Sequence, residues 1–88
     1  MTIVTVCGNG CGTSLLLKIT LEKVLKSEGL SGTVEHTDLS SAGNMTCDFL
    51  MAPIDLEPLL TDVGKPYAVV GNIMSEAEVK EALLQLIG

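Results

Sequence analysis

The chain has 88 residues, 47% of them hydrophobic, and carries a formal net charge of −6. A chain of this length forms one domain, expected over residues 1–88, and buries roughly 60–65% of its unfolded surface. The acidic balance and the absence of arginine argue against nucleic-acid binding, which needs clustered cations. No apolar run approaches the roughly 20 residues of a membrane span, and no signal peptide opens the chain. Together with three cysteines, this predicts a cytoplasmic protein that does not insert into a membrane.

The first predicted elements are a strand and a helix. Residues 2–7 are expected to form a short buried strand, because every position from Thr2 to Val6 is β-branched. A helix is expected from about Ser14 to Glu28, because apolar residues recur there at helical spacing: Leu17, Leu21, Val24 and Leu25. Thr13 or Ser14 can cap its start, and Gly29 suits the position just after its end.

The middle of the chain predicts two further strands. Residues 32–38 have the composition of a strand, and the following segment, 39–46, is expected to be a short helical turn or a loop. A buried strand is predicted from Cys47 to Ala52, halted by Pro53. A short helix is predicted at about Glu57–Val63, because a proline near its start is compatible with a first helical turn.

The C-terminal part predicts a last strand and a last helix. The strand covers Pro66–Val70 and ends at Gly71-Asn72, and a capping box from Ser75 to Glu78 starts the helix. The helix carries an apolar stripe formed by Val79, Leu83, Leu86 and Ile87. Four strands alternating with helical connections predict an α/β fold, a small open four-stranded parallel sheet with right-handed crossovers and helices on both faces.

The candidate functional residues lie in the stretch between the first strand and the first helix. It reads Cys7-Gly8-Asn9-Gly10-Cys11-Gly12-Thr13-Ser14. A strand, a glycine loop and a helix N-terminus together form an arrangement that holds phosphate groups. The same backbone N–H groups lower the pKa of a thiol, so Cys7 is predicted to be a thiolate nucleophile that receives a phosphoryl group. The alternative is a small buried hydrophobe before an ordinary glycine turn.

The predicted phosphate-binding residues follow the nucleophile directly. They are Gly8, Asn9, Gly10, Cys11, Gly12, Thr13 and Ser14. Ser14 has two readings, as a helix cap alone or as a cap that also donates its hydroxyl to the phosphate. Parallel sheets bind ligands at the carboxyl ends of their strands. That edge would bring Asp38, Ala52-Pro53 and Gly71-Asn72 close to Cys7.

The spacing of this stretch excludes three other phosphate or redox motifs. The glycines form G-x-G-x-G and not the dinucleotide pattern G-x-G-x-x-G, and no lysine precedes the hydroxyl residues as in a Walker loop. Cys7 and Cys11 are four residues apart, which differs from C-x-x-C. The layout resembles low-molecular-weight tyrosine phosphatases, in which five residues separate the nucleophilic cysteine from an arginine that is followed by a hydroxyl residue. Thr13 stands at that position here, and the missing arginine favours a phosphoryl carrier over a hydrolase.

The stretch from Cys7 to Lys18 resembles the N-terminal signature of the enzyme IIB components of the bacterial sugar phosphotransferase system. It is most similar to the ascorbate type, with the galactitol and lactose/cellobiose types as relatives. The resemblance implies that Cys7 accepts a phosphoryl group from a phosphohistidine on a IIA partner. Cys7 would then pass it to a sugar or ascorbate-like substrate held by a membrane IIC partner. Neither a cofactor nor a metal is expected, and the second thiol, Cys11, departs from the usual pattern.

Several alternatives remain open at this stage. A small cysteine phosphatase and a redox module with a disulfide between Cys7 and Cys11 are the two rival functions. His36 is expected to be a structural or surface histidine, and Asp38 a turn or capping residue. Lys18 is either a solvated charge or part of a docking rim. Cys47 is expected to be a core thiol. The acidic residues Asp55, Glu57 and Asp62 are read as a solvated face and not as a metal site.

Overall fold

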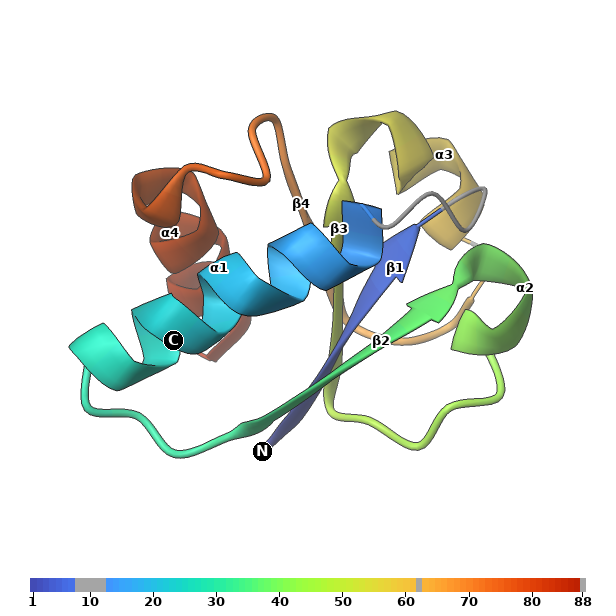
Figure 1. The fold of residues 1–88 in the computed structure, drawn as a ribbon. Helices are drawn as coiled ribbons and strands as arrows, with labels where there is room; N and C mark the ends of the chain where they lie inside the picture. The colour runs from blue at the N-terminus through green and yellow to red at the C-terminus, as the bar shows by residue number, and fades with distance from the viewer. Residues whose placement is uncertain (8–12, 62, 88) are drawn as a thin grey trace.

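The computed structural model describes residues 1–7, 13–61 and 63–87, and it contains one parallel sheet (Figure 1). The strands are β1 (Thr2–Cys7), β2 (Thr33–Asp38), β3 (Phe49–Pro53) and β4 (Tyr67–Val70). Their spatial order is β2-β1-β3-β4, and all three neighbouring pairs are parallel. The predicted four-stranded parallel α/β fold is confirmed. Because β1 lies between β2 and β3, its carboxyl end is flanked by a strand on each side.

The helices cover both faces of the sheet, as predicted. Helices α1 (Thr13–Ser27) and α4 (Glu76–Ile87) lie on one face. The short elements α2 (Leu39–Ala42), η1 (Ile54–Leu56) and α3 (Glu57–Leu60) lie on the other. The alternation of side chains along each strand divides the core in two. One cluster joins Ile3 and Met51 of the sheet to Leu17, Leu21 and Leu83 of the long helices. The other joins Val4, Val6 and Leu50 to Ala42 and Leu60.

Helix α1 ends as its sequence predicts. Gly29 has a φ of +68°, a backbone conformation that glycine adopts without steric cost. The N–H of Gly29 donates to the carbonyl of Lys26 at 3.2 Å, and the N–H of Leu30 donates to the carbonyl of Leu25 at 2.9 Å. This pair of hydrogen bonds is a Schellman motif, which satisfies carbonyls that the end of the helix would otherwise leave open.

The third strand and the helix after it differ from the prediction. The strand was expected at Cys47–Ala52, but β3 covers Phe49–Pro53. Asp48 lies before the strand, where two hydrogen bonds to Thr2 hold it. Its backbone N–H donates to the Thr2 carbonyl at 2.8 Å, and its Oδ2 accepts the Thr2 N–H at 2.7 Å. The following helix was expected over residues 57–63, but α3 stops at Leu60 and is preceded by the 3-10 helix η1.

The start of α4 confirms only half of the predicted capping box. The Ser75 Oγ accepts the N–H of Glu78 at 3.3 Å, as such a cap requires. The Glu78 carboxylate does not return to the N–H of Ser75. Its Oε1 instead accepts the N–H groups of Gly71 and Asn72, at 3.2 and 3.3 Å, because those donors at the end of β4 need a partner. The predicted apolar stripe also ends early, since the last member, Ile87, is 39% exposed.

Candidate functional site

Cys7 is the last residue of β1 and lies at the middle of the carboxyl edge of the sheet (Figure 1). Its Cα pairs in register with that of Asp38, the last residue of β2. The residue is buried, with 3% of its surface exposed. Ligands bind at the carboxyl edge of open parallel sheets. Cys7 therefore lies where this fold is expected to bind a ligand.

The face to which Cys7 belongs follows from the strand itself. Successive side chains alternate between the two faces, so Ile3, Thr5 and Cys7 share one face. Ile3 packs in the same cluster as α1, and Thr5 is completely buried, with its hydroxyl donating to the Glu35 carbonyl at 3.3 Å. Cys7 is therefore on the face of the sheet that carries α1, the helix whose N-terminus follows it.

Helix α1 begins six residues after Cys7 and has 15 residues. A helix of this length concentrates partial positive charge and open N–H groups in its first turn. Figure 1 shows the first turn of α1 close to the arrowhead of β1. The backbone of Thr13 and Ser14 belongs to this turn. The other predicted phosphate-binding residues, Gly8, Asn9, Gly10, Cys11 and Gly12, lie outside the described residues, and their role stays a prediction.

Asp38 is a capping residue, in agreement with the sequence-based expectation. Its Oδ1 accepts the N–H of Ser41 at 2.9 Å and the hydroxyl of Ser40 at 2.8 Å, and so caps α2. The hydrogen bond from the Ser40 side chain, followed by those from Ser41, holds the pKa of the Asp38 carboxyl below its usual value. The Asp38 carboxylate, which belongs to the neighbour of Cys7 in the sheet, therefore serves as the N-terminal cap of α2.

Residues 2–85 match the family described as PTS system, lactose/cellobiose-specific IIB subunit. The chain belongs to this IIB family. It is 35% identical to the ascorbate-specific PTS system EIIB component of Mycoplasma pneumoniae, over 97% of this chain and 93% of the relative. It is 30% identical to the same component of Escherichia coli O157:H7, over 97% of this chain and 87% of the relative. The predicted membership of the IIB components is confirmed.

Two solved structures share the fold of this IIB chain. The lactose-specific IIB domain of Streptococcus pneumoniae superposes with a TM-score of 0.66 and 11% identity, covering 100% of this chain and 98% of that one. A low-molecular-weight protein tyrosine phosphatase from Bacillus subtilis gives a TM-score of 0.55 and 17% identity, covering 99% and 95%. The fold is therefore common to both classes, and only residues at the site can distinguish a carrier from a phosphatase.

The other candidate residues, His36 and Cys47, lie away from Cys7. His36 is exposed in the middle of β2, where it pairs with Thr5 and not with the edge of the sheet. Cys47 precedes β3 at the opposite edge and is half-buried, and desolvation raises the pKa of its thiol. In the part of the chain that the structure describes, no three His, Cys, Asp or Glu side chains gather to form a metal site. No helix among those residues is long and apolar enough to span a bilayer.

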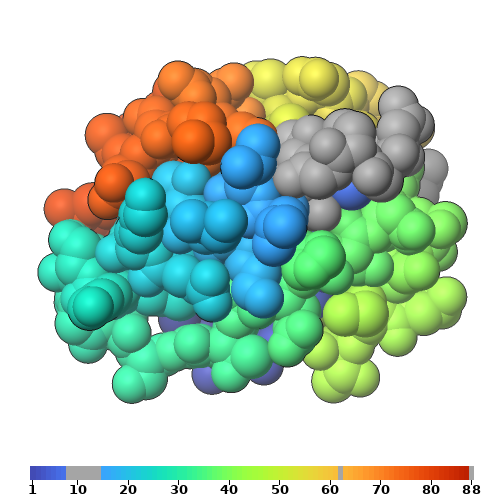
Figure 2. Space-filling view, in the orientation of Figure 1, coloured from blue at the N-terminus to red at the C-terminus, as the bar shows by residue number. Residues whose placement is uncertain are grey.

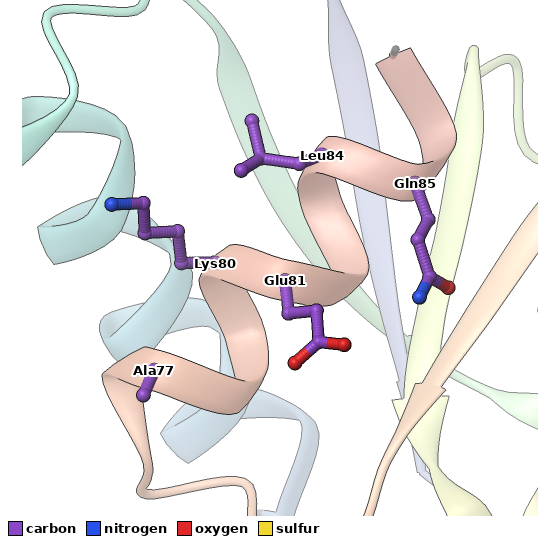
Figure 3. A pocket seen from close by; sticks show the side chains of 5 residues that line it. All are labelled: Ala77, Lys80, Glu81, Leu84 and Gln85. Atoms are coloured by element: carbon purple, nitrogen blue, oxygen red, sulfur yellow. The ribbon is translucent and has the colours of Figure 1, made fainter.

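Two hollows of the surface lie on or beside α4 and do not include Cys7. One has a volume of about 490 Å³ and follows the outer side of the helix; it is lined by Ala77, Lys80, Glu81, Leu84 and Gln85 (Figure 3). The other has about 310 Å³ and lies where the end of β4 meets α4, beside Gly71 and Glu78. The lining of neither hollow contains a cysteine, serine, threonine or histidine, so the carboxyl end of β1 remains the candidate site for a thiol nucleophile.

The sequence analysis missed one feature of the site, the outward face of the first two turns of α1. Three large apolar side chains lie there at the surface: Leu15, Leu16 and Ile19, exposed to 43%, 45% and 43%. Only Leu17 of the leucine run is buried. The signal was present in the sequence, because three consecutive leucines cannot all lie on the core-facing stripe of one helix.

Proposed function

We propose that this IIB chain is a phosphoryl carrier whose nucleophile is the Cys7 thiolate. The observation that carries the proposal is the position of Cys7, which ends the central strand β1 just before the N-terminus of a 15-residue helix on the same face. A thiolate and a phosphoryl dianion are both stabilised by the partial positive charge of such a helix end. The chain acts in the cytoplasm as a single domain over residues 1–88.

The first step takes the phosphoryl group from a phosphohistidine on a IIA partner. The Cys7 sulfur attacks phosphorus, the S–P bond forms, and the P–N bond to the imidazole breaks. The imidazole nitrogen retains the electron pair and takes up a proton. Backbone N–H groups from Gly8 to Ser14 would hold the three phosphoryl oxygens during this step, which is largely a matter of position and charge stabilisation.

The second step returns the thiolate. A hydroxyl of a sugar or ascorbate-like substrate, held by the membrane IIC partner, attacks phosphorus, and the new O–P bond forms as the S–P bond breaks. The sulfur keeps the electron pair as a thiolate, and the hydroxyl proton passes to solvent. The absence of arginine from the chain favours this transfer over hydrolysis. An arginine provides the bidentate clamp that stabilises a phosphoryl transition state when no protein partner contributes.

The test is a reconstituted transfer. The purified chain is phosphorylated through a phosphoenolpyruvate-driven donor chain that ends in candidate IIA proteins. It is then mixed with membrane vesicles that contain the IIC protein and either ascorbate or a neutral sugar. The proposal predicts phosphorylated substrate only when both IIA and IIC are present. Rapid turnover of an aryl phosphate by the chain alone would instead support the phosphatase, and loss of transfer on mild oxidation that Cys11→Ser prevents would support the redox module.

A further inference from the structure

The outward face of α1 changes character along the helix. Residues of a helix are separated by about 100° around its axis, so Leu15, Leu16 and Ile19 lie together within an arc of about 100°, on the side away from the core-facing Leu17 and Val24. All three are exposed. In the next two turns the same outward face is charged, with Glu22, Lys23 and Lys26 exposed. A helix face that only meets solvent would be polar along its whole length.

The apolar half of this face is the half next to the nucleophile. Leu15 and Leu16 lie in the first turn of α1, and Cys7 ends the strand that precedes this helix. Figure 2 shows the first turns of α1, in bright blue, at the surface of the molecule, bordered by the orange segment that joins β4 to α4. A partner that reaches the buried sulfur of Cys7 must cover surface around the carboxyl end of β1, and these side chains are part of that surface.

The charge around the same end also departs from the rest of the chain. The net charge is −6, yet no Asp or Glu occurs before Glu22. Lys18, half-buried on α1, is the only charged side chain in those first 21 residues. The first two turns of α1 therefore present apolar side chains and one cation but no acidic side chain. The carboxylate beside Cys7 belongs to Asp38 at the end of β2, where it is hydrogen-bonded as the cap of α2. Such a surface attracts a partner that carries negative charge beside an apolar contact area.

We infer that Leu15, Leu16 and Ile19, called here the α1 patch, form the docking surface for the phosphohistidine-bearing IIA donor. The inference rests on the proposed function. The donor is the partner that arrives carrying the phosphoryl dianion, which matches the acid-free end of α1 and Lys18. A second copy of this chain is a poorer match, because it would bring a further net charge of −6. The exposed leucines supply the apolar contact that a brief protein–protein encounter needs.

The experiment compares two matched double variants. Leu16→Gln/Ile19→Gln changes the α1 patch, and Leu84→Gln/Ile87→Gln changes two residues with the same spacing on the outer side of α4. The four side chains have similar exposure, 45% and 43% against 44% and 39%, so neither pair should alter the fold. The initial rate of phosphorylation of the chain is measured against the concentration of phosphorylated IIA protein. Circular dichroism and Tm are recorded for both variants.

The inference predicts that KM for the phosphorylated IIA protein rises about tenfold in the α1 variant, the range expected when an apolar contact of an interface is lost. The maximal rate should stay within about twofold, and the α4 variant should behave as wild type. Equal KM values for all three proteins would overturn the inference. So would a loss confined to transfer to the IIC vesicles, or a wild-type dimer that the α1 variant converts to monomer. If no IIA protein phosphorylates the wild type, the proposed function itself fails, and the inference fails with it.

Discussion

Cys7 and Asp38 are neighbours in the sheet, with their Cα atoms paired in register at the ends of β1 and β2. The two residues nevertheless have separate tasks. The carboxylate of Asp38 is bound by the hydroxyl of Ser40 and the N–H of Ser41 and so starts α2. The negative charge closest to Cys7 along the sheet is thus a structural cap, and its contribution is to stability.

Replacing Asp38 should therefore change how stability depends on pH. The pKa of Asp38 is lowered in the folded state from its ordinary value of 3.8. Because its pKa is lowered by folding, the Asp38 carboxylate stabilises the folded protein at pH values above its pKa in the unfolded chain. That stabilisation is lost as the pH falls through its pKa in the folded protein. We expect Asp38→Ala to lower Tm at about pH 6, and the difference from wild type to shrink at pH values below 3.8.

Asp38→Asn is the matched control, because asparagine caps helices as well as aspartate does but does not titrate. This variant should keep most of the wild-type Tm at about pH 6 and lack the part of the acid-dependent loss that belongs to Asp38. Thermal unfolding followed by circular dichroism over this pH range makes the comparison. An identical pH profile for wild type and Asp38→Asn would show that the Ser40 and Ser41 hydrogen bonds do not depend on the charge.

Gly29→Ala should destabilise the protein by about 1 kcal/mol, because a side chain at positive φ is strained. For a domain of this size that corresponds to a fall in Tm of roughly 4–8 °C. Gly43→Ala provides the control, since Gly43 has a helical φ of −67° and nothing lies within 4 Å of an added Cβ. Its Tm should be unchanged or slightly raised. Equal losses for both variants would mean that the Schellman motif after α1 contributes no specific stability.

The Cys47 thiol should react slowly with alkylating reagents at neutral pH. Burial raises its pKa from the ordinary value of 9.0, so the neutral thiol persists to higher pH and little reactive thiolate forms. In a Cys7→Ser/Cys11→Ser variant, we expect alkylation of Cys47 by iodoacetamide to be slower at about pH 7 than in the urea-unfolded chain. The rate should increase as pH rises above 9.0. Equal rates in the folded and unfolded chains would contradict this account of the Cys47 environment.

Much of the fold was predictable because the sequence pattern and the tertiary structure agree. The β-branched run of β1 and the apolar stripe of α1 both specify elements that the core then buries. The boundaries of β1 match the prediction, and those of α1 differ by one residue at each end. The end of α1 was equally predictable, because glycine is favoured at the position just after a helix that Gly29 takes here.

The errors arose where long-range partners decide local structure. Asp48 was assigned to a strand, but its hydrogen bonds with Thr2, 46 residues away in sequence, hold it before β3. Glu78 was assigned to a capping box, but its carboxylate binds the end of β4. At the candidate site, sequence reasoning located Cys7 at the sheet edge and overlooked the exposed Leu16, because helical spacing was used only to find the core.

The measurement that tests the central claim most directly is the intact mass of the chain after incubation with a phosphoenolpyruvate-driven donor chain ending in the cognate IIA protein. Wild type, Cys7→Ser and Cys11→Ser are treated in parallel, and circular dichroism establishes that each is folded. The account predicts one phosphoryl adduct on wild type and on Cys11→Ser, and none on Cys7→Ser. A folded wild type that gains no adduct, or an adduct that persists in Cys7→Ser, would contradict the assignment of Cys7 as the phosphoryl-carrying nucleophile.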